Sequence, residues 1–426
     1  MKAAVARNVH IFLGFFKTDP MICIFIFALA VRMLGLFYVS DLNDTDMHQF
    51  DEFGAIVNHL LSGEGFSRTY HGKLFPSAYM PPAYAFFITG IFLLFGKNTF
   101  SFILIHIVEV VLGAAMCIIL YKIGEKYFSA KVALGAGLIA SIYPVFVYMC
   151  TQFSVSPYIF LNCLLFLSLT KLCEEPSNFL LVITGLILGL LTLFRAEVLG
   201  YIPFLIGWIF FNVRKDSRIK ATLIPILLIF LILTPWSLRN YFVFHKLIPV
   251  ATTGGYNLWR GHNPQASGGA DSGHIPPCIV EEINNLLPTK DFEVKRDNIF
   301  LRKAISFIKT NPGENILLTF KKFIFFWTID PTYGPDIASL SGRKGGSKHP
   351  LYIIPWLTIL PFFIIGLVST RYQPKKYSLF YLYFTLSTVV AMVFFVLPRY
   401  RLFIEPFIII FATHGVMICY DRFFRR

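Results

Sequence analysis

The chain is short of charge for its length. Only 15% of its 426 residues are Asp, Glu, Lys or Arg, whereas 56% are hydrophobic, and a soluble domain carries about 25% charged residues. Acidic residues are scarcer than basic ones, with 24 Asp and Glu against 38 Lys and Arg. We therefore expect an integral membrane protein. The hydrophobicity also argues against nucleic acid as the partner for the net charge of +14.

Cysteine and several catalytic motifs are also scarce or missing. The seven cysteines are scattered, and all but Cys278 lie in or beside apolar segments, so neither a disulfide framework nor a zinc site is indicated. The sequence holds no Walker A, HExxH, CxxC or GxSxG motif. ATP hydrolysis, zinc proteolysis and serine hydrolysis therefore have no basis in the sequence.

Long hydrophobic runs dominate what is present. Most are close to the ~20 residues needed to cross a bilayer, and they lie near 20–39, 82–96, 100–120, 132–149, 157–172, 178–193, 198–212, 221–236, 351–368, 377–397 and 403–420. They predict an all-α polytopic fold with ten to twelve transmembrane helices, the first retained rather than removed as a signal peptide. The segment 82–96 is either juxtamembrane or re-entrant, or else the basic loop 122–131 breaks the positive-inside rule.

Three regions follow from these runs and the polar segments between them. Residues 1–239 form an N-terminal transmembrane module with a first outer loop at 40–81, residues 240–350 a polar excursion with interfacial helices, and residues 351–426 the last transmembrane helices. Basic segments at the N-terminus, 214–220, 371–376 and the tail should be cytoplasmic. The unusual polar segments then share the opposite, extracytoplasmic face.

The scarce acids gather in one segment. Five of them lie within twelve residues after the first apolar run, at Asp41, Asp44, Asp46, Asp51 and Glu52. Apolar residues then recur at helical spacing between 50 and 61, which predicts an amphipathic helix on the membrane surface. Asp46 stands just ahead of this helix, where its carboxylate could act as a general base. The alternative is that Asp44 or Asp46 caps the helix.

Arginines interrupt the apolar runs at three further places. Arg195 and Glu197 lie between two runs, Arg239 ends another, and Arg399 and Arg401 separate the last two. Charges at membrane depth indicate functional sites, and a guanidinium can hold a phosphate through two hydrogen bonds. The alternative is that these side chains only reach water at the headgroup level.

A polar and aromatic segment lies between residues 253 and 263. It contains Asn257, Trp259 and His262 and is flanked by glycines, so we expect a turn. Aromatic rings beside amide and imidazole groups suit the mixed apolar and hydroxyl faces of a sugar. The segment is therefore a candidate for sugar or acceptor binding, together with Arg195 and Glu197.

Taken in chain order, these pieces resemble a GT-C class membrane glycosyltransferase. The resemblance is to the branch that holds dolichyl-phosphate-mannose protein mannosyltransferases and lipid A aminoarabinose transferases. The segments that carry it are 46–66, 76–96, 143–144, 194–197, 235–240, 254–263 and 399–402. One departure is clear: the family often has a second acid after the Tyr-Pro pair, where residues 151–157 carry no carboxylate.

The resemblance implies a function and roles for residues. A hexosyl- or pentosyltransferase of this kind moves a sugar from a polyprenyl-phosphate-linked donor to a lipid, glycan or protein acceptor. Asp46, with Asp44 beside it, matches the catalytic acid. The donor phosphate would be bound by residues that the matching segments supply, which are Arg239, Arg399, Arg401 and, more loosely, Lys73.

The resemblance also implies a location and leaves alternatives open. We expect the inner membrane of a bacterium, with the site facing the periplasm or exterior. No nucleotide cofactor is needed; a divalent cation held by Asp44 and Asp46 is possible, although no essential metal is expected. The alternatives are a transporter or flippase of lipid-linked sugars, and a polysaccharide polymerase or ligase.

Overall fold

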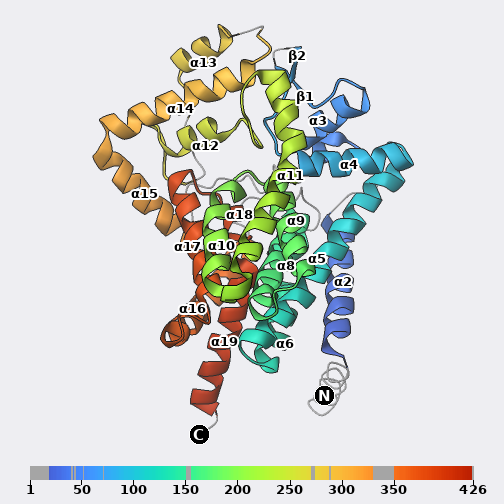
Figure 1. Cartoon of the computed structure of the whole chain (residues 1–426), viewed down its shortest axis with the longest axis vertical. Coiled ribbons are helices and arrows are strands. Elements are labelled where there is room, and N and C mark those ends of the chain that lie inside the picture. Colours follow the sequence, from blue (N-terminus) through green and yellow to red (C-terminus); the bar gives the residue numbers. More distant parts are fainter. Residues whose placement is uncertain are drawn as a thin grey trace.

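A computed structural model describes residues 19–39, 42, 45–50, 52–70, 72–149, 155–269, 274–286, 289–329 and 350–424. Most of this part is helical. Figure 1 shows a helical bundle that holds both ends of the chain at one extremity, and a layer of short helices and strands at the other. We call this second part the cap layer.

The bundle contains helices long and apolar enough to cross a membrane. In the described residues there are six, which are α2 (Pro20–Val39), α5 (Thr99–Tyr127), α8 (Val155–Glu174), α11 (Arg218–Phe244), α16 (Pro350–Ser369) and α19 (Glu405–Phe424). Shorter apolar helices are α4 (Pro82–Phe95), α6 (Ala130–Ile142), α9 (Asn178–Phe194), α10 (Val198–Asn212) and α17 (Ser378–Val393). The predicted all-α polytopic fold is confirmed, and the chain is an integral, multi-pass membrane protein.

Close backbone contacts hold the bundle together. Helix α5 packs against α2, α6 and α8, and α16 packs against α19. At the last pair, a Cβ on Gly366 would lie 2.0 Å from the Phe411 carbonyl oxygen, and one on Gly415 would lie 2.1 Å from that of Phe362. Only glycine allows this approach, and small residues are the usual means by which membrane helices meet.

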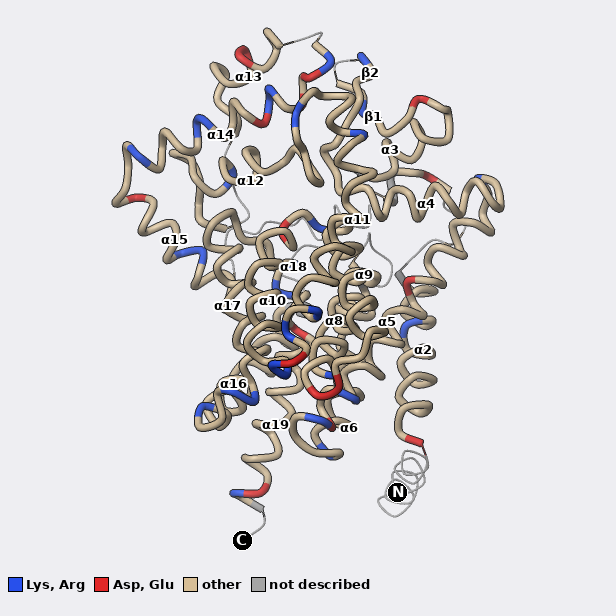
Figure 2. Tube along the Cα trace, viewed as in Figure 1, with Lys and Arg blue, Asp and Glu red and all other residues tan. Residues whose placement is uncertain are grey.

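The cap layer is built from both halves of the chain. Its elements are η1 (Met47–Phe50), α3 (Glu52–Leu61), β1 (Ser67–Tyr70), β2 (Lys73–Pro76), α4, α12 (Gly254–Gly261), α13 (Pro277–Asn284) and α14 (Phe292–Thr310). The predicted amphipathic helix is α3, whose Phe53 packs edge-on to Tyr84 of α4 at 5.1 Å between ring centroids. Figure 2 shows charged residues of both signs over this layer.

The length and position of helix α4 bear on whether residues 82–96 cross the membrane. It has 14 residues, which corresponds to about 21 Å, less than the ~30 Å of a hydrocarbon core. It packs against α3 in the cap layer. The structure therefore favours the juxtamembrane alternative over a full crossing.

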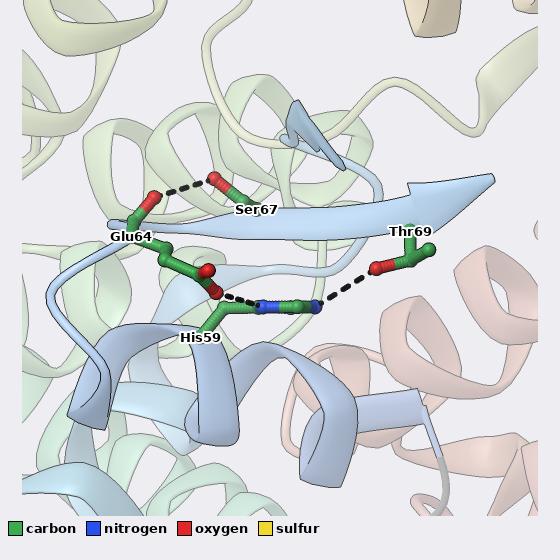
Figure 3. A network of polar contacts seen from close by, with 4 residues as sticks. All are labelled: His59, Glu64, Ser67 and Thr69. Carbon is green, nitrogen blue, oxygen red and sulfur yellow. Dashed lines mark hydrogen bonds and ion pairs between the residues drawn. The ribbon is translucent and has the colours of Figure 1, made fainter. Parts of the chain in front are cut away.

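Polar contacts join α3 to the strand that follows it. Figure 3 shows His59 between Glu64 and Thr69: its Nδ1 lies 2.5 Å from Glu64 Oε2, and its Nε2 lies 3.2 Å from Thr69 Oγ1. The Ser67 hydroxyl donates to the Glu64 carbonyl oxygen at 2.8 Å. These contacts fix the first strand against the helix.

Two details of the cap layer differ from the sequence prediction. Strands β1 and β2 form an antiparallel hairpin, with Ser67 opposite Pro76, which the all-helical prediction did not include. The segment expected as a turn is a helix, α12. Its first amides donate to Asp297 of α14, from Gly255 at 2.9 Å and Tyr256 at 2.8 Å. A cap from a residue more than 40 positions away has no local sequence signal.

The remaining elements are connecting segments. They are α7 (Pro144–Met149), η2 (Lys215–Ser217), α15 (Pro312–Trp327), η3 (Thr370–Tyr372) and α18 (Pro398–Arg401). Two of them, η2 and η3, join helices of the bundle to one another. Helix α15 descends from the edge of the cap layer beside the bundle (Figure 1). It leaves Lys321 exposed and buries Lys322 completely.

Candidate functional site

A cavity of about 610 Å³ lies where the cap layer meets the bundle. The cap layer contributes α3, the segment 79–81 and α12, and the bundle contributes the junction of α9 and α10, the end of α17 and α18. Tyr79, Tyr256, Phe394 and Phe403 supply aromatic walls. Such a cavity is large enough for a sugar and its phosphate.

Three arginines line this cavity, and we call them the cavity arginines: Arg195, Arg260 and Arg399. Arg195 follows the last residue of α9 and its guanidinium stacks over Phe403 at 4.6 Å, while Arg260 in α12 stacks over Phe395 at 3.8 Å. All three guanidiniums act on Tyr400: burial raises the pKa of its phenol, and their positive charges oppose that rise. The three charges therefore converge on one wall.

Two of these arginines have donors with no partner in the part of the chain that the structure describes. The Nε atoms of Arg195 and Arg399 are buried and have no hydrogen-bond partner among the described residues. A buried donor without a partner costs about 1–3 kcal/mol, and more when it is charged. An anion bound in the cavity would remove this cost.

One carboxylate faces these charges. Glu197 is the acidic side chain among the described residues that line the cavity, and its Oε1 lies 4.0 Å from Arg195 Nε. That distance is beyond a hydrogen bond. The carboxylate therefore keeps acceptor capacity for the hydroxyl groups of a ligand.

The structure brings together only some of the residues predicted from the sequence. Arg195, Glu197, Asn257 and Arg399 all line the cavity. Lys73 lies on β2 with its side chain exposed, away from the lining. Trp259 is buried in the core of the cap layer, where it packs against Ile279, Ile299, Phe300 and Ala304.

Two predicted phosphate ligands have partners within the protein instead. Arg239 donates to the carbonyl oxygens of Ser77 at 2.6 Å and Phe66 at 2.8 Å. Arg401 is 3% exposed, lies 2.9 Å from Glu405 and stacks on Trp356 at 3.5 Å. Neither lines the cavity, so we assign both to holding the structure together.

His262 lies behind the cavity wall in a chain of polar contacts. Its Nδ1 is 2.7 Å from Asn315 Oδ1, and its Nε2 is 2.8 Å from the Val393 carbonyl oxygen and 2.9 Å from Lys322 Nζ. Asn315 Nδ2 donates to two carbonyl oxygens, so its Oδ1 is the acceptor of a hydrogen bond donated by His262 Nδ1–H. His262 therefore joins α12 to α15 and α17 rather than facing the cavity.

Of the two acids predicted as catalytic, the structure describes one. Asp44 lies outside the described residues, and Asp46 is exposed immediately before η1. The carbonyl of Met47 lies against Gly54, where a Cβ would come within 2.0 Å of its oxygen. Since Phe53 lines the cavity, this contact keeps the segment after Asp46 close to the cavity wall.

Comparison with known proteins relates this arrangement to a family. Residues 79–238 match the sequence family described as dolichyl-phosphate-mannose-protein mannosyltransferase. This match agrees with the resemblance carried by the sequence motifs, and it covers the α9–α10 junction that holds Arg195 and Glu197. A comparison with curated protein sequences found no match.

Solved structures share the fold over nearly the whole chain. The oligosaccharyltransferase of Archaeoglobus fulgidus superposes in its apo form with a TM-score of 0.56 at 10% identity, over 96% of this chain and 51% of that one. With a tethered acceptor peptide its TM-score is 0.58, again at 10% identity, over 96% and 50% of the two chains. The chain has the GT-C fold. It spans about half the length of that archaeal enzyme, and identity this low establishes the fold alone.

A second GT-C structure matches less closely. ArnT from Cupriavidus metallidurans, bound to undecaprenyl phosphate, gives a TM-score of 0.40 at 12% identity, over 93% of this chain and 79% of that one. We draw no argument from a superposition at that level.

Three residues that line the cavity were not selected as candidates from the sequence. Arg260, Tyr79 and Tyr400 line the cavity. Arg260 stands within a segment selected for its other residues, so its charge was a usable signal. Tyr79 and Tyr400 had none, because tyrosines are common in this chain, which has 20 of them.

A metal site is not evident in the described residues. No group of three or more His, Cys, Asp or Glu side chains lies close enough to hold an ion in that part of the chain. Asp44 is outside it, so the pair of Asp44 and Asp46 stays a prediction.

Proposed function

We propose that the chain is a hexosyl- or pentosyltransferase that uses a polyprenyl-phosphate-linked sugar and transfers it to a lipid, glycan or protein acceptor. The observation that carries this proposal is the convergence of the cavity arginines within a GT-C fold. Two of them have buried Nε donors that find no partner among the residues the structure describes. The family match supports a lipid-phosphate donor, because the description of that family names dolichyl-phosphate-mannose. Nothing comparable favours a transporter, a polymerase or a ligase.

The donor would be held by charge at its phosphate. Arg399 and Arg195 have the free donors, and Arg260 adds a third guanidinium on the same wall. Guanidiniums bind phosphate oxygens in a fixed planar geometry. Their charge also stabilises the leaving group as the bond to the sugar breaks, which is the larger contribution to the rate. Asn257 and Glu197 would hold the sugar hydroxyls.

The reaction is a single displacement. The acceptor oxygen or nitrogen attacks the anomeric carbon, and the bond from that carbon to the phosphate oxygen breaks. The electron pair leaves with polyprenyl phosphate, and a carboxylate takes the proton of the acceptor. No nucleotide takes part in this sequence.

Asp46 is our proposal for that carboxylate, and Asp44 could assist it. The resemblance assigns the role to Asp46, and the packing of Met47 on Gly54 keeps its segment beside the α3 wall of the cavity. Glu197, which lines the cavity, is the competing candidate. The two can be separated by experiment, because only the catalytic one should abolish transfer while donor binding is retained.

The setting we propose is the inner membrane of a bacterium, with the cap layer and the cavity on the periplasmic or exterior side. Basic segments at 214–220 and 371–376 support this orientation, because both lie at the end of the bundle away from the cap layer. The three sequence regions 1–239, 240–350 and 351–426 would then all contribute to one site.

The test is binding of undecaprenyl phosphate to the full chain in lipid nanodiscs. Arg399→Gln should weaken binding by about 10–100-fold, the equivalent of one or two charge-assisted hydrogen bonds. Arg422→Gln removes the same charge from the exposed end of α19 and should leave binding unchanged. Equal affinities for wild type and Arg399→Gln would refute the assignment of the phosphate site.

The catalytic carboxylate needs a second comparison. Asp46→Asn and Glu197→Gln are tested for sugar transfer in a strain that lacks the gene, with undecaprenyl phosphate binding measured on the same proteins. We expect Asp46→Asn to abolish transfer and bind the lipid normally. Full transfer by Asp46→Asn together with loss in Glu197→Gln would move the role to Glu197.

A further inference from the structure

A second group of arginines and tyrosines lies beside the cavity arginines. Arg68 of β1 and Arg296 of α14 flank Tyr79, with their guanidinium carbons 4.1 and 5.8 Å from the centre of its ring. Both also approach Tyr70, at 5.4 and 5.8 Å, and Arg296 lies 5.3 Å from Tyr256. We call these five residues the rim cluster, because Tyr79 and Tyr256 belong to the cavity lining and the others adjoin them.

The rim cluster stands on a rigid support. Glu293, only 3% exposed, accepts hydrogen bonds from the Ser77 hydroxyl at 2.7 Å, the Ala78 amide at 2.9 Å and the hydroxyls of Tyr70 and Thr252. Asp297, one turn further along α14, caps α12. Residues 293, 296 and 297 share one face of α14. The helix therefore holds Arg296 and the adjoining rings at fixed positions.

The two rim arginines are separate from the arginines that would hold the donor phosphate. The cavity arginines and the two rim arginines supply five positive charges, against the carboxylates of Glu197, Glu293 and Asp297 and the proposed catalytic Asp46. A polyprenyl-phosphate sugar is a phosphodiester with one negative charge. Two of these carboxylates are already occupied by donors of the protein. With the donor phosphate held by the cavity arginines, Arg68 and Arg296 are the guanidiniums that the rim cluster offers to a second ligand.

The chemistry of the rim cluster suits a charged sugar. Tyrosine faces pack against the C–H faces of a pyranose, and phenol groups bond to its hydroxyls. A guanidinium that stacks on an aromatic ring still has N–H donors pointing outward in the guanidinium plane, and these can bind a carboxylate or phosphate. All five residues of the rim cluster are charged or phenolic, so a purely hydrocarbon ligand would cover these groups without bonding to them.

We propose that the rim cluster is the acceptor site, and that the acceptor is a glycan carrying a carboxylate or phosphate group. This rests on the proposed function, since it places the acceptor next to the donor phosphate. It restricts the acceptor to anionic glycans, which the proposed function leaves open.

The test measures binding of three tetrasaccharides to the full chain in nanodiscs. The probes are tetragalacturonate, which carries carboxylates, singly phosphorylated maltotetraose, and neutral maltotetraose. The wild type should bind one or both acidic probes at least about tenfold more tightly than the neutral one, since hydrogen bonds to charged groups exceed neutral ones. The difference should shrink as salt is raised, because salt screens exposed charges.

The variant Arg68→Gln/Arg296→Gln should lose this preference and retain binding of maltotetraose. The control Arg302→Gln/Lys309→Gln removes two positive charges from the exposed part of the same helix and should keep the preference. Since the double variant could disturb folding, Arg296→Gln alone is measured as well and should lose part of the preference. A preference that survives in both rim variants, or equal wild-type affinity for acidic and neutral probes, overturns the proposal.

Failure of the proposed function would look different. It would appear as absent undecaprenyl phosphate binding in the wild type, whatever the tetrasaccharides do. An acidic probe that binds the wild type and not the rim variants would still support an anionic glycan site in that case.

Discussion

The buried pair of Lys322 and His262 should make the stability of the protein depend on pH in a specific way. Burial lowers the pKa of Lys322 from 10.5 to about 7, and burial together with the charge of Lys322 lowers the pKa of His262 from 6.5. Between about pH 7 and 10.5 the native lysine is largely neutral while the unfolded chain holds the proton. The unfolded state then binds more protons, so the free energy of unfolding rises with pH.

The change in the free energy of unfolding with pH is limited by the single proton that Lys322 can bind. A single proton gives at most about 1.4 kcal/mol per pH unit, so the rise between pH 7 and 9 is on the order of 2–3 kcal/mol. With about 2.1 cal/mol/K of unfolding entropy per residue, this corresponds to roughly 2–3 °C in the apparent Tm of a chain of 426 residues. The His262 contribution has the same sign and lies below pH 6.5.

The assay follows tryptophan fluorescence of the nanodisc-bound protein during heating at a series of pH values. Lys322→Met removes the titrating group and should flatten the rise between pH 7 and 9. Lys321→Met is the matched control, because the neighbouring lysine is exposed, and it should keep the wild-type slope. An unchanged slope in Lys322→Met would refute the reasoning, whereas its absolute Tm, which also reflects the lost hydrogen bonds, is not the test.

Three other substitutions test the architecture. Gly54→Ala places a Cβ 2.0 Å from the Met47 carbonyl oxygen, so it should shift the segment that follows Asp46 and reduce sugar transfer more than undecaprenyl phosphate binding; equal losses of both would contradict this. Arg401→Ala leaves Glu405 buried without its partner and should cost about 3–5 kcal/mol, seen as a lower Tm or poor expression; a stable variant that has lost only lipid binding would restore Arg401 as a phosphate ligand. Glu293→Ala removes an acceptor with four donors and should lower the Tm, with faster hydrogen exchange in α14; unchanged exchange would show that these four hydrogen bonds do not hold α14 in place.

The membrane helices and the cap helix α3 were readable from the sequence because their signals are local. Runs of apolar residues and helical spacing between 50 and 61 each belong to a single element. The helix α12 could not be predicted from its own residues, because the side chain that caps it belongs to Asp297, in another helix. The β1–β2 hairpin was missed because its four-residue strands are too short for a clear alternation.

The candidate site was predicted in part for the same reason. Residue type identified the arginines, but their roles depend on partners. For Arg239 those partners are carbonyl groups of residues 66 and 77, more than 160 positions away. For Arg401, at the end of α18, the partner is Glu405, at the start of α19. Their separation of only four residues was a local signal of an ion pair. Arg399, two residues before Arg401, points instead to the cavity.

The measurement that tests the central claim most directly is mass spectrometry of envelope glycolipids and glycoproteins. It compares a deletion strain with strains rescued by the wild type, by Arg399→Gln and by Arg422→Gln. We predict that one glycan of the deletion strain lacks a single sugar, which the wild type and Arg422→Gln restore and Arg399→Gln does not. Full rescue by Arg399→Gln, or a lipid-linked precursor that accumulates on the cytoplasmic side, would contradict a transferase that works through the cavity arginines.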